Sequence, residues 1–193
     1  MLKKRFYILL FFCLLLGGNV NSSTVDKGDN NAPFENKRTE TDYLPIADPF
    51  VMLYNNKYYA YGTGGTVNEG FACFSSDDLK NWKRERQALS ADDSYGKWGF
   101  WAPEVYYIQS KKKFYMFYSV EEHICVATSD SPVGPFRQES KQPIWEEKSI
   151  DTSLFIDDDG TPYLYFVRFT DGNVIWVAQM TDDLMKIKKE TLS

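Results

Sequence analysis

The stretch "ACFSSDDLKNWKRE" at residues 72–85 recurs in two degenerate copies, "CVATSDSPVGPFRQE" at 125–139 and "WVAQMTDDLMKIKKE" at 176–190. Each copy has a short apolar strand, a polar step to an aspartate, a turn, an apolar or aromatic residue, and then basic residues and a glutamate. The shared aspartates lie at intervals of 53 and 52 residues: Asp77, Asp130 and Asp182. A period of this size indicates a fold built from repeated units. In the turns we expect these aspartates to cap the local backbone.

A β-hairpin is predicted upstream of each copy. The three segments are "DPFVMLYNNKYYAYG" (48–62), "APEVYYIQSKKKFYMFYS" (102–119) and "DTSLFIDDDGTPYLYF" (151–166). Their turns contain residue types that tolerate tight or left-handed backbone, and they lie at Asn55–Asn56, Ser110–Lys112 and Asp157–Gly160. No segment keeps an apolar pattern at i, i+3, i+4 and i+7, so we expect no substantial helix.

Each unit therefore contains four short strands in about 50 residues, which is the size of a β-propeller blade. The predicted fold class is all-β, with about three four-stranded blades at residues 42–95, 96–147 and 148–193. Because closed propellers have at least about four blades, we expect 42–193 to be an incomplete propeller, the N-terminal part of a longer one. The alternative is an open or self-associating array of three blades.

Residues 1–23 have the features of a secretory signal peptide. Three basic residues, Lys3 to Arg5, precede an apolar run from Phe6 to Leu16, which is followed by small and polar residues. The run is too short to span a bilayer, which takes about 20 residues. We expect export to the periplasm, cell surface or exterior, no membrane insertion after leader cleavage, and a flexible lead-in at residues 24–41.

The charge balance argues against nucleic acid as a partner. The chain carries 27 acidic and 22 basic residues, and three of the basic ones lie in the leader. An acidic exported domain is poorly suited to nucleic acid or to an anionic membrane surface. A neutral ligand such as a carbohydrate fits better.

Aligning the three units places Asp48, Ala102 and Asp151 in one position, at the start of the first strand. In a propeller this strand lines the central channel. A structural cap needed by every blade would recur in every blade, yet the second blade has alanine here. The two aspartates are therefore predicted to serve chemistry. Two carboxylates at one channel mouth suit glycoside hydrolysis, in which one carboxylate activates water and a carboxylic acid protonates the leaving oxygen.

The chain resembles glycoside hydrolase family 43, the five-bladed propeller glycosidases of the arabinanase and β-xylosidase group. Four stretches carry the resemblance: "ADPFVML" (47–53), "SSDDLKNW" (75–82), "FWAPEVYY" (100–107) and "SIDTSLFIDDDGTPYL" (149–164). Together they span nearly all of residues 42–193. The resemblance implies inverting hydrolysis of polysaccharides or oligosaccharides that contain arabinose, xylose or galactose.

The resemblance also implies roles for individual residues. Asp48 matches the general base, and Asp151 matches the aspartate that orients the acid and modulates its pKa. Trp101 matches a position near the sugar, while Phe50 and Phe100 are candidates for the pocket wall that fit the blade core about equally well. Glu104, in the "WAPE" box, is expected to be structural or adjacent to substrate rather than the acid.

The family's general-acid glutamate begins the fourth blade and, on this period, would fall beyond Ser193. Members often hold an ion in the central channel, but the matching ligand would also lie beyond this chain. The single histidine, His123, lacks a second ligand at metal-binding spacing, so we expect no metal and no cofactor. Two alternatives to a hydrolase remain open: an inactive carbohydrate-binding remnant, and a half-propeller completed by a partner chain.

Overall fold

The computed structural model describes residues 44–64, 69–170 and 172–193. The predicted leader and most of the predicted lead-in lie outside the described residues. In the described ranges, no helix is long and apolar enough to cross a membrane.

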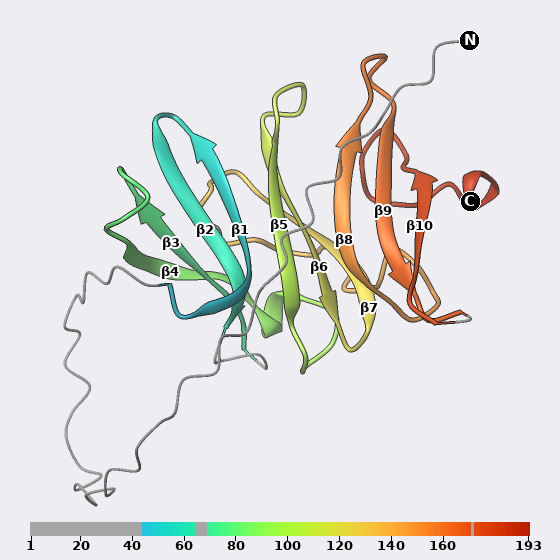
Figure 1. The fold of residues 1–193 in the computed structure, drawn as a ribbon, viewed down its shortest axis with the longest axis horizontal. Coiled ribbons are helices and arrows are strands. Elements are labelled where there is room, and N and C mark those ends of the chain that lie inside the picture. The colour runs from blue at the N-terminus through green and yellow to red at the C-terminus, as the bar shows by residue number, and fades with distance from the viewer. Residues whose placement is uncertain (1–43, 65–68, 171) are drawn as a thin grey trace, which may run out of the picture. The chain divides into compact units, whose positions relative to one another are not determined.

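Ten strands account for most of the described chain (Figure 1). They are β1 (Ile46–Tyr54), β2 (Lys57–Gly64), β3 (Gly70–Ser76), β4 (Lys83–Ser90), β5 (Trp101–Ile108), β6 (Lys113–Val120), β7 (His123–Ser129), β8 (Ser149–Ile156), β9 (Pro162–Arg168) and β10 (Val174–Gln179). The helical elements of this part are two three-residue 3₁₀ turns, at Ala91–Asp93 and Lys189–Thr191. The expectation of an all-β fold without a substantial helix is confirmed.

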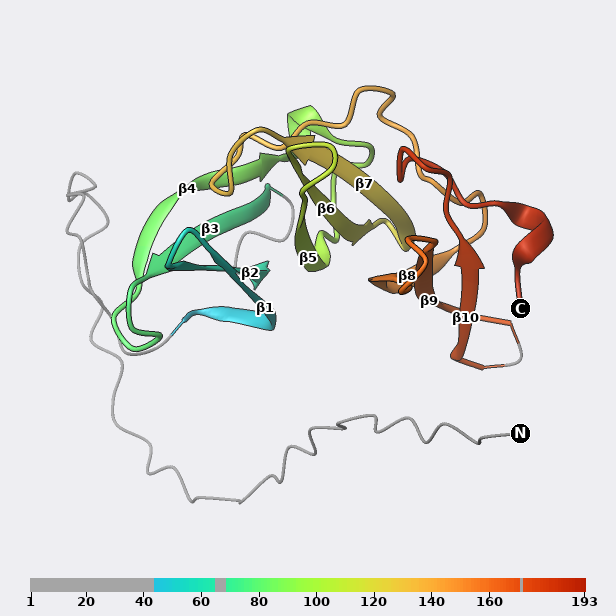
Figure 2. The ribbon, with the colours of Figure 1, turned by 90° about the horizontal axis from the view of Figure 1, so that it is seen from above.

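The strands form three antiparallel sheets, each made by one repeat unit, in the orders β1-β2-β3-β4, β5-β6-β7 and β8-β9-β10. Seen from above, the sheets stand next to one another as sectors, with β4 and β7 at the outer margin (Figure 2). β5 packs against β1 and β2, and β8 packs against β5, β6 and β7. This is the blade arrangement of a propeller, and the first strand of each unit is the inner one.

The fourth strand of the second and third blades is shorter than predicted. Within the described part of the chain, only the first blade has a four-stranded sheet. In the other two the outer segment is reduced to single bridges, Thr128–Arg137 and Met180–Ile187. In the second blade this segment contains Pro132 and Pro135, which have no backbone N–H to donate to a ladder.

The predicted hairpin turns are confirmed. Asn55 and Asn56 have φ values of 49° and 60°, which suit the two-residue turn between β1 and β2. Lys112 and Gly160 supply positive φ in the other two turns. Because the turns fix the pairing register, they also fix which residue of each inner strand reaches the channel mouth.

The middle sheet is buried on both faces. Alternate residues of β6 enter two different clusters: Phe114, Met116 and Tyr118 pack toward the first sheet, and Tyr115 and Phe117 toward the third. This double burial explains why "KFYMFYSV" reads as a nearly continuous apolar run rather than an alternating one. Each fully buried large side chain contributes about 1.5–3 kcal/mol relative to exposure.

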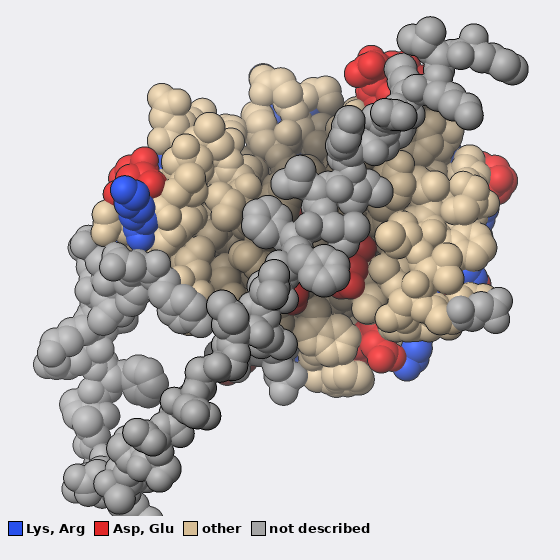
Figure 3. All heavy atoms as spheres, viewed as in Figure 1, with Lys and Arg blue, Asp and Glu red and all other residues tan. Residues whose placement is uncertain are grey.

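Parts of the outer faces of the first and third sheets are apolar and exposed. Val51 and Leu53 on β1 are 43% and 58% exposed, and Tyr165 and Ile175 on the third sheet are 41% and 71% exposed. They alternate with residues that pack toward the middle sheet, so they point away from it. In the view of Figure 3, uncharged side chains form most of the described surface, with acidic atoms near its middle.

Candidate active site

The inner strand of each sheet carries the same backbone irregularity at the aligned position. Asp48, Ala102 and Asp151 have φ values of 46°, 44° and 54°, and each lies within a break in the strand register. Such a bulge re-aims the side chain out of the regular pleat. Left-handed backbone is tolerated better by aspartate than by alanine, for which it costs about 1–2 kcal/mol. The alignment made from the sequence is thus matched by a shared local geometry.

A threonine on the neighbouring strand holds Asp48. The Thr63 hydroxyl, on β2, donates to Asp48 Oδ2 at 2.8 Å. The Thr63 hydroxyl oxygen also accepts the backbone N–H of Ala102, in the next sheet, at 2.9 Å. Because one hydroxyl makes both bonds, the Asp48 carboxylate is oriented by the contact that joins the first two blades.

A hydroxyl of the second blade likewise accepts a backbone N–H of the third blade, that of Asp151. Ser119, on β6, accepts the backbone N–H of Asp151 at 3.1 Å. The surrounding protein removes part of the water from the exposed Asp151 carboxylate, and the negative charge of Asp48 adds to this effect, so both raise its pKa. The two aspartates are therefore close enough to repel each other.

A third carboxylate lies close to Asp151. Glu104 is partly buried on β5, and its Oε2 accepts a hydrogen bond from the Tyr106 hydroxyl. The Tyr106 oxygen also accepts the backbone N–H of Leu154 at 3.2 Å, which ties β5 to β8. Burial raises the pKa of Glu104, hydrogen bonds from Tyr106 and Ser153 oppose this, and the charge of Asp151 adds to the rise. Glu104 thus belongs to a bridge between the second and third blades.

The aromatic candidates lie in different surroundings. Trp101 is partly exposed at the start of β5. Phe50 is partly buried and packs on Tyr106 with ring centroids 5.4 Å apart. It lines a groove of about 510 Å³ between the inner strands, together with residues that include Met52, Val105 and Leu154. Phe50 therefore faces the inner side of the blades.

Phe100 lies in the core of the blades. It is fully buried in the cluster between the first two sheets. Its ring packs edge-on against Phe71 at 5.7 Å and stacks on Tyr118 at 6.2 Å. Of the two alternatives that the sequence left open for Phe100, the burial agrees with the blade core, whereas the next residue, Trp101, is partly exposed.

The predicted backbone caps lie one residue later than the repeated aspartates. Asp78 Oδ1 accepts the backbone N–H groups of Lys80 and Asn81 at 2.9 and 2.8 Å. These bonds and those from the Asn81 and Ser76 side chains hold the pKa of Asp78 well below its usual range. In the third blade Asp183 has this role, accepting Met185 N–H at 3.1 Å.

The repeated aspartates instead pair with the lysine that opens the second strand of their blade. Asp77 forms an ion pair with Lys57 at 3.0 Å, and Asp130 pairs with Lys113 at 2.9 Å. In the third blade the strand opens with Pro162, which offers no charge to Asp182.

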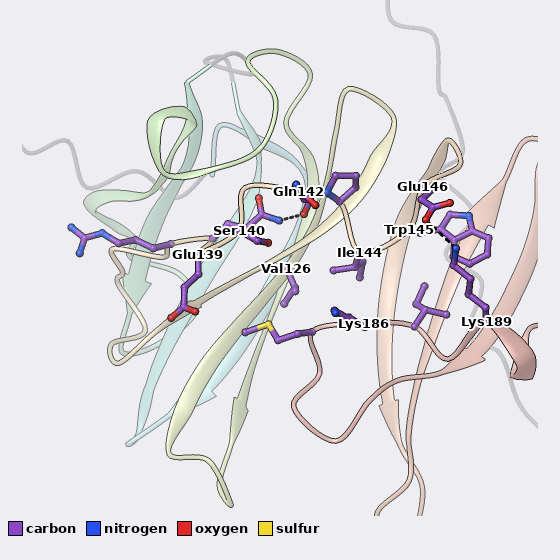
Figure 4. Close-up of a pocket in the computed structure, with 14 residues that line it drawn as sticks. Val126, Glu139, Ser140, Gln142, Ile144, Trp145, Glu146, Lys186 and Lys189 are labelled. Carbon is purple, nitrogen blue, oxygen red and sulfur yellow. Dashed lines mark hydrogen bonds and ion pairs between the residues drawn. The ribbon is translucent and has the colours of Figure 1, made fainter.

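A larger groove, of about 600 Å³, lies on the outer side of the second and third blades (Figure 4). The Trp145 ring forms one side, with Lys189 5.6 Å above it and ion-paired to Glu146 at 3.0 Å. None of its lining residues comes from β1, β5 or β8. The groove is therefore separate from the paired aspartates.

Metal and cofactor ligands were not expected. Within residues 44–64, 69–170 and 172–193, no three histidine, cysteine or acidic side chains are grouped so that they could hold a metal ion. The His123 ring Nδ1 lies 2.8 Å from the Glu121 carbonyl oxygen. The expectation concerning the family's channel ion remains a prediction.

Sequence reasoning missed Thr63 and Ser119. Each hydroxyl lies six residues after the lysine that opens its strand, Lys57 or Lys113, so a hairpin-on-hairpin alignment contains the signal. In the third blade the matching position in the strand register is Val167, which lies opposite Ile150 and has no hydroxyl. The role of a polar residue at a strand end cannot be predicted from the sequence until its hydrogen-bond partner in the next blade is known.

Comparison with known proteins gives a consistent result. The family model described as "Glycosyl hydrolases family 43" matches residues 44–193. A curated relative from Aspergillus fumigatus, named "Probable arabinan endo-1,5-alpha-L-arabinosidase B", is 27% identical over 80% of this chain and 46% of its own length. The "Arabinoxylan arabinofuranohydrolase" of Bacillus subtilis is 30% identical over 62% of this chain and 30% of its own length.

A solved structure is much more similar in sequence. The crystal structure of an "Endo-1,4-beta-xylanase" from Bacteroides thetaiotaomicron is 86% identical, with a TM-score of 0.77, over 80% of this chain and 53% of that one. The present chain thus spans about half, or less, of the length of these three proteins.

Proposed function

Because the chain belongs to glycosyl hydrolase family 43, we propose that it supplies the water-activating half of an inverting glycoside hydrolase. Its substrates are polysaccharides or oligosaccharides that contain arabinose, xylose or galactose. The observation that carries the proposal is the pair Asp48 and Asp151. Both occupy the same left-handed bulge on inner strands, and the charge of one raises the pKa of the other.

In the proposed reaction Asp48 is the general base. It takes a proton from water while the water oxygen bonds to the anomeric carbon, and the bond from that carbon to the leaving oxygen breaks on the opposite face. Thr63 donates to Oδ2, and among the described residues no other side chain or backbone group binds this carboxylate, so Oδ1 is available to the water. Asp151 orients and tunes the acid that protonates the leaving oxygen. By the family resemblance this acid is a glutamate outside residues 1–193.

The sugar lies between these carboxylates and the aromatic residues. The part-exposed Trp101 and part-buried Phe50 offer apolar faces on β5 and β1, and such faces pack against the C–H groups of a sugar ring. Neutral sugars need no counter-charge, which agrees with the acidic character of the chain. The proposed reaction uses no cofactor.

The test uses aryl glycosides with a good leaving group, such as 2,4-dinitrophenyl arabinofuranoside, xyloside and galactoside. Their phenolate departs without protonation, so turnover depends on the base and not on an acid. We expect the chain to hydrolyse at least one of them, Asp48→Asn to lose a hundredfold or more, and the control Asp77→Asn to retain full activity. Equal rates for the chain and Asp48→Asn, or no turnover of any substrate, would contradict the proposal. Sugar binding without turnover would favour the inactive carbohydrate-binding alternative.

We also propose that a further polypeptide covers the two exposed sheet faces. Val51 and Leu53 at one end, and Tyr165 and Ile175 at the other, present apolar side chains of the kind that pack between blades. Relatives that are about twice as long contain enough chain to form such a cover. Sedimentation of the purified chain as a stable, non-associating monomer would argue against a cover supplied by a partner chain.

Export is part of the proposal. Its support is the pattern of residues 1–23, a basic start followed by an apolar run. Mass spectrometry of the protein from periplasmic and culture fractions should find a new N-terminus close to residue 24. Recovery of the intact Met1 form from the cytoplasm alone would contradict it.

A further inference from the structure

The loop before β5 exposes an indole ring next to the candidate site. Trp98 is 51% exposed, whereas the other four tryptophans are buried or partly buried. Its ring lies beside that of Trp101, with centroids 6.4 Å apart and planes 77° apart. A large apolar ring left in water at the edge of a site is a candidate binding surface.

The loop is held in place by specific hydrogen bonds. The backbone N–H of Lys97 donates to Glu121 Oε1 at 2.7 Å, and the backbone N–H of Glu121 donates to the Trp98 carbonyl oxygen at 3.2 Å. The backbone N–H of Tyr95 donates to Gln138 Oε1 at 2.8 Å. The loop backbone that carries Trp98 is therefore already ordered, so that binding a ligand there requires little further ordering of the backbone.

A glycine allows the two rings to approach each other. Gly99 has φ +66°, and a Cβ at this position would lie 2.9 Å from Trp101 Cζ2. Any other residue would push against the Trp101 ring. Gly99 therefore lets the chain turn tightly between the two tryptophans.

The ring pair is connected to the proposed base through short steps. Trp101 is bonded to Ala102, whose N–H is accepted by the Thr63 hydroxyl, which in turn donates to Asp48. Trp101, against which the Trp98 ring packs, therefore directly precedes the residue that shares the Thr63 hydroxyl with the proposed base.

We propose that Trp98 extends the sugar-binding surface begun by Trp101, so that the site takes a chain of several sugar residues. This inference rests on the proposed function. Because the two rings are nearly perpendicular, they fit successive sugars whose faces are rotated relative to each other. A twisted or flexible pentose chain meets this condition, and a flat β-1,4-glucan ribbon does not.

Calorimetric titration of the full chain tests the inference. The probes are xylose, arabinose, xylotetraose, 1,5-arabinotetraose and cellotetraose, and the variants are Trp98→Ala, Trp98→Phe and Leu79→Ala. Leu79 is 48% exposed in the β3–β4 turn and serves as the matched control. We expect Trp98→Ala to weaken binding of a pentose tetraose about tenfold and to leave monosaccharide binding unchanged. Trp98→Phe should recover most of the affinity, Leu79→Ala should have no effect, and cellotetraose should bind no better than a monosaccharide.

The outcomes separate the inference from its premise. The inference alone would be overturned if Trp98→Ala left the affinity for the pentose tetraoses unchanged. It would also be overturned if the variant lost affinity for the monosaccharide by the same factor. Binding of cellotetraose as tight as that of the pentose tetraoses would overturn the assignment to a twisted chain. Absence of binding to every sugar would overturn the proposed function and, with it, this inference.

Discussion

Replacement of Thr63 by valine removes the hydroxyl that joins the first two blades while keeping the shape of the side chain. The hydroxyl makes one bond to a carboxylate and one to a backbone N–H. Such bonds contribute about 1.5–3 and about 0.5–1.5 kcal/mol respectively. Since Asp48 is exposed, the lower ends apply, and Thr63→Val should reduce the free energy of unfolding by about 2 kcal/mol. For a domain of this size the corresponding fall in Tm is about 4–8 °C.

The assay is thermal and urea denaturation followed by circular dichroism at pH 7. Thr63→Ser keeps the hydroxyl and should lose less than half as much stability as Thr63→Val. A double-mutant cycle with Asp48→Asn isolates the bond to the carboxylate, and we expect an interaction energy of about 1 kcal/mol. Equal losses for the serine and valine variants would refute the role of the hydroxyl. Strict additivity in the cycle would refute its coupling to Asp48.

Three further substitutions have defined outcomes. The folded-state pKa of Asp151 is raised, so its ionisation disfavours the fold as pH rises from the ordinary value of 3.8 through the folded value. Asp151→Asn should therefore raise Tm at pH 7 and leave it unchanged at pH 3, and a rise of equal size at both pH values would contradict this. Asp78→Asn should lower Tm at pH 7 more than Asp77→Asn does, because Asp78 caps the turn. The pKa of Asp78 is lowered, so the difference in Tm between the two variants should disappear as pH falls below 3.8. A difference that persists at low pH, or a larger loss of Tm for Asp77→Asn, would contradict the assignment of Asp78 as the cap. Gly99→Ala should reduce stability by about 1–2 kcal/mol and shift the near-ultraviolet signal of Trp101, and an unchanged spectrum would count against the close approach.

The blade pattern could be predicted from the sequence because it is local. Turn residues such as Asn55 and Gly160 need left-handed backbone, and the strands between them alternate or are wholly apolar. The period of 52 and 53 residues then places each hairpin in a separate unit. Asp48 and Asp151 are predicted as site residues by the same means, because their aligned position holds alanine in the second unit while the repeated positions do not change.

The features that were missed depend on contacts between units. The role of Thr63 depends on its hydrogen bond with Ala102, which is 39 residues away in the sequence. Phe100 and Trp101 are neighbours of similar chemistry, and only the packing against Phe71 decides that one is core and the other surface. The repeat of Asp77 predicts a cap for the turn, but in the structure its carboxylate pairs with Lys57 across the blade.

The most direct test of the central claim is the anomeric configuration of the first sugar released by the chain from an activated aryl glycoside, followed by proton NMR before mutarotation. If Asp48 activates a water molecule for direct displacement, the first product has the configuration opposite to that of the substrate. Release of a sugar with the substrate's own configuration would show that water does not attack the substrate directly. That result would contradict the assignment of Asp48 as a general base.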